Sequence, residues 1–417
     1  PKHWKEVEVF SSRDETRKPW GAIALFHGEH IPGADPKAFE KQKIKARRLA
    51  ADITRNATND AGRVDAIFRY ITANFRYTQM YESRIASIKP HPVPDILANR
   101  CGDCKDLSIL MIELLKACGI EAYPALVRTL GEGHIITNVA SPDVFNHMIV
   151  YLPRLGAGQF VDPTFRHGEW NLLPGQCQGV WAFVLTEDSY RFVRTPLMPA
   201  ADCRTALALS GALAPDGSCT GVMTLTLERL DAAQARAGLE RMDDLRKIGS
   251  YYVARIEPGA RLTDFSTAHL APSNVPLVIR MGFDSPRFAQ PGDRFLSLKL
   301  PWPLEPEGLH SGLERRTHPL RLDTLKEEFR DYTFTVPAGF TCDIPSTNVT
   351  LRSRFGSFDF CARQNGDTLR ADWQLRLTKR EISSASYGAF RRFLSRCAET
   401  SSQLITLRPP RAVPEDQ

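Results

Sequence analysis

Cysteine-based catalysis needs three residue types, and the sequence offers them at Cys104, His147 and Asp162. A cysteine thiol becomes a strong nucleophile when a neighbouring base takes its proton and a third group orients that base. Cys104 lies in a turn-rich run, NRCGDCKD, directly before an amphipathic pattern. We therefore expect it at or just before the first turn of a helix, where unpaired backbone N–H groups and partial positive charge favour a thiolate.

The helix after Cys104 is predicted by apolar residues spaced at i, i+3, i+4 and i+7. Gly119 follows this pattern, at the place where a left-handed C-terminal cap is expected. The segment Ile120–Arg128 then has the composition of a buried strand. The expected apolar face of the helix comprises Leu107, Leu110, Met111, Leu114, Leu115 and Cys118.

A hairpin is expected to bring His147 and Asp162 together. His147 lies in a strand-like run, FNHMIVYLP, and Asp162 ends another, GQFVDPTF. The six residues 153–158 between the two runs are typical of a hairpin connection. In an antiparallel hairpin centred near Leu155, His147 and Asp162 lie within one or two residues of facing each other, close enough for the carboxylate to orient the imidazole.

Two helices are expected upstream of Cys104. The first spans residues 35–57, and the second begins after Asn59 and Asp60, residue types that cap helix N-termini well. The connection 78–91 is long, which favours a substrate-facing role. Tyr77 or Gln79 is a candidate to assist the Cys104 backbone N–H in binding an oxyanion. The apolar face of the second helix comprises Val64, Ile67, Phe68, Ile71 and Phe75.

These segments resemble the transglutaminase-like core, a branch of the papain-like thiol enzymes. The matching runs are GDCKD, LLKACGIEAYP, NHMIVYL and FVDPT, within residues 36–195. The resemblance implies Cys104 as nucleophile, His147 as general base and then acid, and Asp162 as the group that orients His147. It also implies helices packed on an antiparallel sheet, and it requires neither a cofactor nor a metal ion.

The expected fold class is α+β, with this core followed by a mostly-β, sandwich-like C-terminal region. Residues 1–35 are expected to be a linker or the remnant of a preceding β-domain, and residues 36–200 the catalytic core. Alternating runs and one helical stretch predict a β-rich module at 201–307. More alternating runs and a terminal helix predict a sandwich-like domain at 308–417. The whole arrangement resembles multidomain proteins of the bacterial envelope.

Composition excludes several other classes. Hydrophobic residues make up 42% and charged residues 24% of the chain, as in ordinary globular proteins. The net charge of +6 is spread along the sequence, and no basic patch interleaved with aromatic residues argues for nucleic-acid binding. No apolar run approaches the roughly 20 residues of a membrane-spanning helix. The first residue is not Met, which suggests a fragment or processed form from which a signal peptide could have been removed.

Several residues admit other interpretations. Cys101 and Cys104 form a C-x-x-C motif, but no second ligand pair supports a zinc site and no βαβ start supports a redox pair. A disulfide between them would instead silence the nucleophile. His134 and His167 compete with His147 for the role of base, and both are expected in loops. Asp103, Lys105 and Asp106 are most simply explained by helix capping and dipole matching.

The function expected is cleavage of amide or peptide bonds in protein or peptide substrates through a thioester intermediate. Hydrolysis, as by a protease or amidase, is favoured over transfer to an amine. The alternative is an inactive scaffold of the cell envelope that docks partner proteins through its C-terminal β-domains. The resemblance favours a periplasmic or cell-envelope location.

Overall fold

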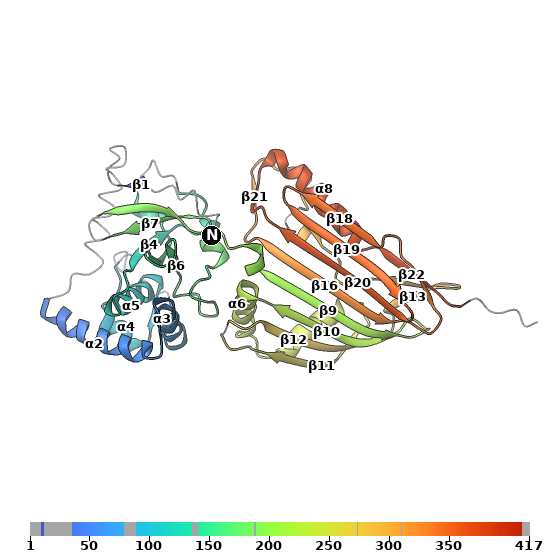
Figure 1. Ribbon diagram of the computed structural model, residues 1–417, viewed down its shortest axis with the longest axis horizontal. Coiled ribbons are helices and arrows are strands. Elements are labelled where there is room, and N and C mark those ends of the chain that lie inside the picture. The colour runs from blue at the N-terminus through green and yellow to red at the C-terminus, as the bar shows by residue number, and fades with distance from the viewer. Residues whose placement is uncertain are drawn as a thin grey trace, which may run out of the picture. The chain divides into compact units, whose positions relative to one another are not determined.

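The computed structural model describes residues 10–11, 36–78, 89–135, 141–186, 189–272, 274–309 and 311–410. The chain divides into two compact units, residues 1–198 and 199–417 (Figure 1). Most of the expected N-terminal linker lies outside the described residues, as do Gln79 and most of the connection 78–91. The fold class is α+β, as predicted.

In the described part of the first unit, four α-helices accompany a six-stranded sheet that is antiparallel at every pairing. The helices are α2 (Pro36–Thr54), α3 (Asp60–Asn74), α4 (Val93–Asn99) and α5 (Cys104–Ala117). Helix α5 packs on the sheet, and the other three helices pack on α5. The sheet order is β1 (Phe10–Ser11), β8 (Tyr190–Arg194), β7 (Trp181–Leu185), β4 (Tyr123–Val127), β5 (His147–Leu152) and β6 (Gln159–Val161). A short parallel pair, β2 (Arg76–Tyr77) and β3 (Cys101–Gly102), precedes α5.

The start of α3 and both ends of α5 lie where the sequence predicts. The Asn59 side chain accepts a hydrogen bond from the Gly62 N–H and so caps α3. Asp103 caps α5, and Asp106 completes a reciprocal capping box by accepting from the Asp103 N–H. Gly119, after the end of α5, has a φ of +76°, the left-handed conformation that favours glycine.

Helix α5 is the centre of the first unit's core. It contacts α2, α3, α4 and strand β5. Its predicted apolar face is buried except for Cys118, which is partly buried, and full burial of each large apolar side chain stabilises the fold by about 1.5–3 kcal/mol. The completely buried apolar side chains on α5 are Leu110, Met111, Leu114 and Leu115. Cys104 is partly buried and packs against a second cluster of six buried side chains, which includes Phe183 and Phe192.

The second unit is built on an eight-stranded sheet. Its order is β11 (Arg261–Ala268), β12 (Leu277–Ser285), β10 (Cys219–Leu227), β9 (Arg204–Leu213), β16 (Lys326–Thr335), β20 (Thr368–Leu377), β19 (Gly356–Asn365) and β18 (Asn348–Ser353). A four-stranded sheet, β13 (Ala289–Pro291), β14 (Leu296–Lys299), β22 (Leu404–Arg408) and β17 (Thr341–Asp343), shares its hydrophobic core. A two-stranded sheet joins β15 (Leu320–Arg321) to β21 (Glu381–Ile382).

Three helices complete this unit: α6 (Arg229–Leu239), α7 (Arg246–Ala254) and α8 (Ser384–Ser401). The single helical stretch expected within residues 201–307 is therefore two helices, α6 and α7. The predicted terminal helix is α8, which contacts β18 and β19. Strand β22, which follows α8, was not anticipated.

The modules expected at 201–307 and 308–417 contribute strands to one sheet. Strands β9 and β16 pair in parallel, with Glu327 opposite Arg204 at one end and Thr335 opposite Ala212 at the other. Arg204 donates two hydrogen bonds, at 2.9 and 3.0 Å, to the buried carboxylate of Glu327. The division expected at 307/308 therefore separates two strands that are hydrogen-bonded to each other. The pairing joins residues far apart in sequence.

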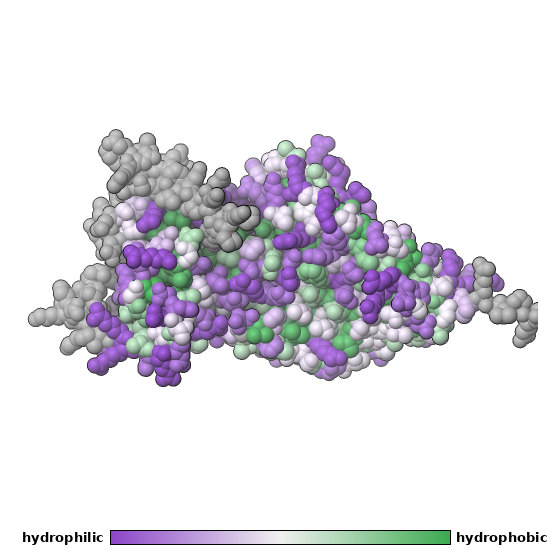
Figure 2. Space-filling view, in the orientation of Figure 1, coloured by the Kyte–Doolittle hydropathy of each residue, from purple (hydrophilic) through white to green (hydrophobic). Residues whose placement is uncertain are grey.

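The surface of the described residues is mixed in character. Figure 2 shows hydrophilic side chains interspersed with small apolar areas over the second unit. None of the helices that the structure describes has both the length and the apolar character needed to cross a membrane.

Candidate active site

Cys104 is the first residue of α5, as the turn and the helical pattern predict. The residues on either side of it are buried and form an ion pair between Lys105 Nζ and Asp103 Oδ2. Asp106 Oδ1 accepts the His91 N–H at 2.7 Å, which fastens the upstream segment to the first turn of α5. The predicted capping role of Asp103 and Asp106 is confirmed, with the Lys105 ion pair in addition.

One hydrogen bond joins α5 to the strand that carries His147. Ser108, about one turn after Cys104, donates its hydroxyl hydrogen bond to the Met148 carbonyl at 3.0 Å. Ser108 is fully buried, and such a bond has no competing water. This hydrogen bond fixes the first turn of α5 against the start of β5, and so it helps to position Cys104 relative to His147.

The predicted hairpin positions His147 beside Asp162. Strands β5 and β6 pair antiparallel, with Val150 opposite Val161 and Leu152 opposite Gln159. Continued by one residue, this register places Asp162 opposite Ile149, two residues from His147 on the same face of β5. His147 Nε2 and Asp162 Oδ2 are 2.9 Å apart, the distance of a charge-assisted hydrogen bond.

The carboxylate of Asp162 is held from both sides. Its Oδ1 accepts hydrogen bonds from the Thr164 N–H at 3.0 Å and from the Thr164 hydroxyl at 2.7 Å. Its Oδ2 faces His147 and also accepts a weak hydrogen bond from the Cys177 thiol at 3.9 Å. The side chain is only 1% exposed, so these partners replace water around the charge.

The pKa values of the two groups shift in the directions expected of an ion pair. Burial lowers the pKa of His147, but the charge and hydrogen bond of Asp162, with contacts from the Cys104 and Cys177 thiols, raise it well above 6.5. Burial raises the pKa of Asp162, but the charge and hydrogen bonds of His147 and Thr164 bring it below 3.8. The imidazolium and the carboxylate therefore stabilise each other.

Cys177 is a member of this group that the sequence interpretation missed. It ends the short 3₁₀ helix η5 (Gly175–Cys177) and is completely buried. Burial raises the pKa of its thiol, which therefore remains protonated. The surrounding run, LLPGQCQGVW, contains no motif that marks Cys177 as part of a site. Nothing in its spacing from His147 or Asp162 could have revealed the contact, because a loop carries it there.

The other residues singled out in the sequence lie elsewhere or play other parts. Tyr77 is 41% exposed, on β2. All nine cysteines are free thiols, so Cys101 and Cys104 form no disulfide in this structure. His134 is exposed after the 3₁₀ helix η3 (Leu130–Glu132), and His167 is buried in a turn. Neither is a member of the group around Asp162, and Gln79 lies outside the described residues.

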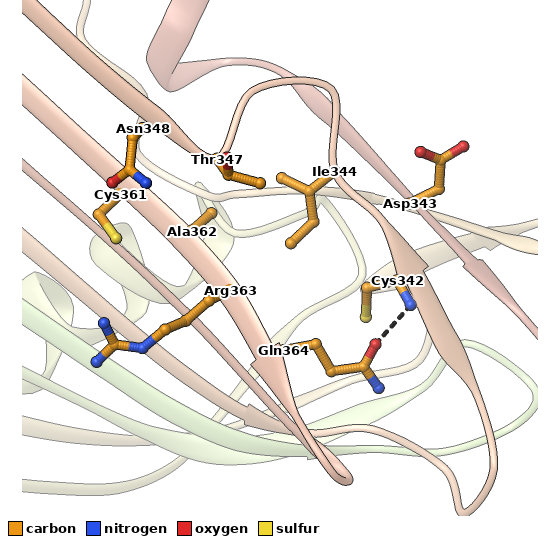
Figure 3. A pocket seen from close by; sticks show the side chains of 9 residues that line it. All are labelled: Cys342, Asp343, Ile344, Thr347, Asn348, Cys361, Ala362, Arg363 and Gln364. Atoms are coloured by element: carbon orange, nitrogen blue, oxygen red, sulfur yellow. Dashed lines mark hydrogen bonds between the residues drawn. The ribbon is translucent and has the colours of Figure 1, made fainter.

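The second unit also has a hollow of about 540 Å³ (Figure 3). Gln364, one of its lining residues, accepts a hydrogen bond from the Cys342 N–H and donates to the carbonyls of Phe340 and Gly366. Burial raises the pKa of Cys342 to about 11, so this thiol is protonated at neutral pH. Gln364 thus links β17 to β19 beside the hollow, and Cys342 is not activated as a nucleophile. The hollow is lined by Cys342, Asp343, Ile344, Thr347, Asn348, Cys361, Ala362, Arg363 and Gln364.

Comparison with known families agrees with this geometry. Residues 47–153, which include Cys104 and His147, match the transglutaminase-like superfamily. The first unit has a transglutaminase-like core. Residues 301–407 match DUF3858, a domain of unknown function with a solved structure. None of the curated proteins compared with the chain matches it.

Among solved structures, one that resembles the chain aligns with most of its length. It is the crystal structure of a "putative protease" from Parabacteroides distasonis ATCC 8503, with a TM-score of 0.58 and 14% sequence identity. The alignment covers 94% of this chain and 58% of that one, so this chain spans little more than half of the neighbour's length. At this identity the likeness concerns the fold alone.

Proposed function

We propose that the transglutaminase-like core is a cysteine hydrolase that cleaves amide or peptide bonds in protein or peptide substrates. The observation that carries the proposal is the buried His147–Asp162 pair, 2.9 Å apart, with the Cys104 thiol beside the same imidazole. A base held by a carboxylate and facing a thiol at a helix start is the arrangement that activates a cysteine nucleophile.

The proposed reaction starts with the thiolate of Cys104 attacking the carbonyl carbon of the scissile amide. The electron pair of the carbonyl moves to oxygen, where backbone N–H groups at the start of α5 stabilise the developing charge. His147 then gives its proton to the leaving nitrogen, and the C–N bond breaks to leave a thioester on Cys104. Asp162 holds the imidazole ring in orientation throughout.

Water completes the proposed cycle. Neutral His147 takes a proton from a water molecule, whose oxygen attacks the thioester, and the acid product and free thiol are released. An amine in place of water would give transfer rather than hydrolysis, and this is the second outcome we consider. The description of the structural neighbour as a protease supports hydrolysis.

Thiol labelling tests the proposal first. The full chain is treated with iodoacetamide between about pH 5 and 9, and each cysteine is quantified by peptide mass spectrometry. We expect selective labelling of Cys104 at the acid end of this range, because a thiolate–imidazolium pair persists below the pKa of a free thiol, about 8.5. His147→Ala should abolish this selectivity, whereas His134→Ala, on an exposed loop, should leave it intact.

Substrate screening then separates hydrolysis from transfer. Casein and a peptide library are incubated with the wild type and with Cys104→Ala, with and without a fluorescent primary amine. New peptide termini that require Cys104 indicate hydrolysis, and amine incorporation indicates transfer. Equal labelling of Cys104 and a surface thiol, unchanged in His147→Ala, would reject the enzyme and favour the scaffold alternative.

A further inference from the structure

His147, Asp162 and Cys177 form the one group among the described residues in which three metal-ligating side chains converge. Their ligand atoms all lie within 4.8 Å of one another. The Nε2–Oδ2 distance is 2.9 Å and the Sγ–Oδ2 distance is 3.9 Å. The group combines an imidazole nitrogen, a carboxylate oxygen and a sulfur, which is the donor set of a zinc site.

The distances in this group suit a tetrahedral ion. Zinc bonds of about 2.0–2.3 Å to nitrogen, oxygen and sulfur imply ligand atoms roughly 3.3–3.8 Å apart. The Nε2–Oδ2 and Sγ–Oδ2 separations of 2.9 and 3.9 Å lie on either side of that range, and all three ligand atoms lie within 4.8 Å of one another, so small rotations of the side chains would bring them into contact with one ion. Three protein ligands leave a fourth position open, as in catalytic zinc sites.

The residues around the group already orient the ligands. Thr164 occupies Oδ1 of Asp162 with two hydrogen bonds, which leaves Oδ2 as the oxygen directed at His147 and Cys177. Metal sites use such outer contacts to fix a carboxylate in place. A carboxylate and a thiolate together also balance the two positive charges of the ion, which suits a buried site with side chains no more than 9% exposed.

We propose that His147, Asp162 and Cys177 bind a zinc ion and that this binding inhibits the cysteine hydrolase. Zinc at His147 Nε2 and Asp162 Oδ2 would replace the hydrogen bond that orients the base, and the protons of His147 Nε2 and of the Cys177 thiol would pass to solvent. With zinc on Nε2, the neutral ring carries its remaining proton on the other nitrogen, so His147 can no longer accept the proton of Cys104. The inhibitory part of the inference rests on the proposed function, whereas the binding part does not.

Binding is measured on the full chain after reduction and removal of metal. Zinc chloride is titrated in competition with a chromogenic chelator, and cobalt chloride is used as a spectroscopic substitute, because thiolate ligation gives an intense near-ultraviolet absorption. We expect one equivalent to bind, with the thiolate–cobalt band present in both the wild type and Cys104→Ala. Since outer-shell changes alone reduce metal affinity about 10–100-fold, we expect Cys177→Ser to reduce it at least 100-fold.

Cys118→Ser serves as the matched control, because this partly buried thiol lies in the same unit, near Thr54 rather than in the group. It should bind zinc like the wild type. Circular dichroism establishes that each variant folds, and the cobalt spectrum of Cys104→Ala decides the question even if Cys177→Ser does not fold. Absence of the thiolate–cobalt band in Cys104→Ala, or unchanged affinity in folded Cys177→Ser, would overturn the site.

Inhibition is measured as the iodoacetamide labelling rate of Cys104 with and without one equivalent of zinc chloride. We expect at least a tenfold slower rate, restored by a chelator, in the wild type and in Cys118→Ser. If zinc binds but Cys104 is never selectively labelled, the proposed function is rejected and the zinc site stands. Selective labelling that stoichiometric zinc leaves unchanged would reject inhibition while the proposed function stands.

Discussion

At the scale of single residues, the ion pair of His147 and Asp162 depends on the protonation state of both side chains. Asp162 has a pKa below 3.8 and His147 a pKa well above 6.5, so the pair is fully charged between these limits. The pair therefore stabilises the folded state across this window. Its contribution is lost in acid as Asp162 is protonated, and lost in base as His147 is deprotonated.

We predict that His147→Gln is destabilised by about 3 kcal/mol near pH 6, because it leaves a buried carboxylate without its charged partner. The raised pKa of His147 gives the sign of the pH dependence: its contribution is complete below about pH 6.5 and declines as pH rises through the folded-state pKa. The difference in unfolding free energy from the wild type should therefore shrink towards about pH 10.

Urea unfolding followed by tryptophan fluorescence measures this difference at several pH values. His134→Gln is the control, since its side chain is exposed and its pH profile should parallel the wild type. A difference between wild type and His147→Gln that stays constant from neutral pH to pH 10 would mean that the imidazole is not charged in the folded protein.

At the scale of elements, the start of α5 depends on a buried ion pair as well as a cap. Asp103 is 2% exposed and Lys105 is 3% exposed, and the two side chains form an ion pair. The carboxylate of Asp103 also accepts hydrogen bonds from the N–H groups of Lys105 and Asp106. Capping alone is worth about 1 kcal/mol, whereas separating buried charges costs several.

We predict that Asp103→Asn destabilises the protein by about 3 kcal/mol, because the amide keeps the cap but removes the charge facing Lys105. The double variant Asp103→Asn with Lys105→Met should recover most of this loss, since it removes both charges together. Urea unfolding of the four proteins in a double-mutant cycle measures the coupling. Equal stability of the single and double variants would show that the ion pair is not the cause.

Local signals in the sequence account for most of the elements near the site. Asn59 and Gly119 mark helix ends, and the six residues between the runs of His147 and Asp162 predict the hairpin that joins them. The same local logic cannot locate Cys177, because its approach to Asp162 is set by an irregular loop. The buried state of Lys105 is likewise a tertiary effect, which overrides the ordinary preference of lysine for water.

At the scale of the whole molecule, residues 199–417 form a single compact unit. Turn signals in the sequence identify its hairpins, including β9 with β10 and β19 with β20. No turn joins β9 to β16, whose partners Arg204 and Glu327 are 123 residues apart. The parallel pairing therefore cannot be predicted from neighbouring residues, and the division expected at 307/308 falls between strands of one sheet.

We predict that residues 199–417 fold when expressed without the first unit, whereas residues 199–307 do not. The shorter fragment keeps β9 to β12 but loses β16, which pairs along nearly the whole of β9. It also loses Tyr332, Phe334 and Trp373 from the shared core. Circular dichroism and the cooperativity of urea unfolding measure the outcome. A cooperative transition in the shorter fragment would show that the 307/308 division is a true domain boundary.

The parallel pairing of β9 and β16 has a consequence for the order of events during synthesis. Because a ribosome delivers the chain from its N-terminus, Arg204–Leu213 emerges long before Lys326–Thr335. In that interval β9 presents an open row of backbone donors and acceptors to any other nascent chain. High contact order also makes such pairing slow. The second unit is therefore the part of the protein in which chaperones and translation rate should matter most for yield.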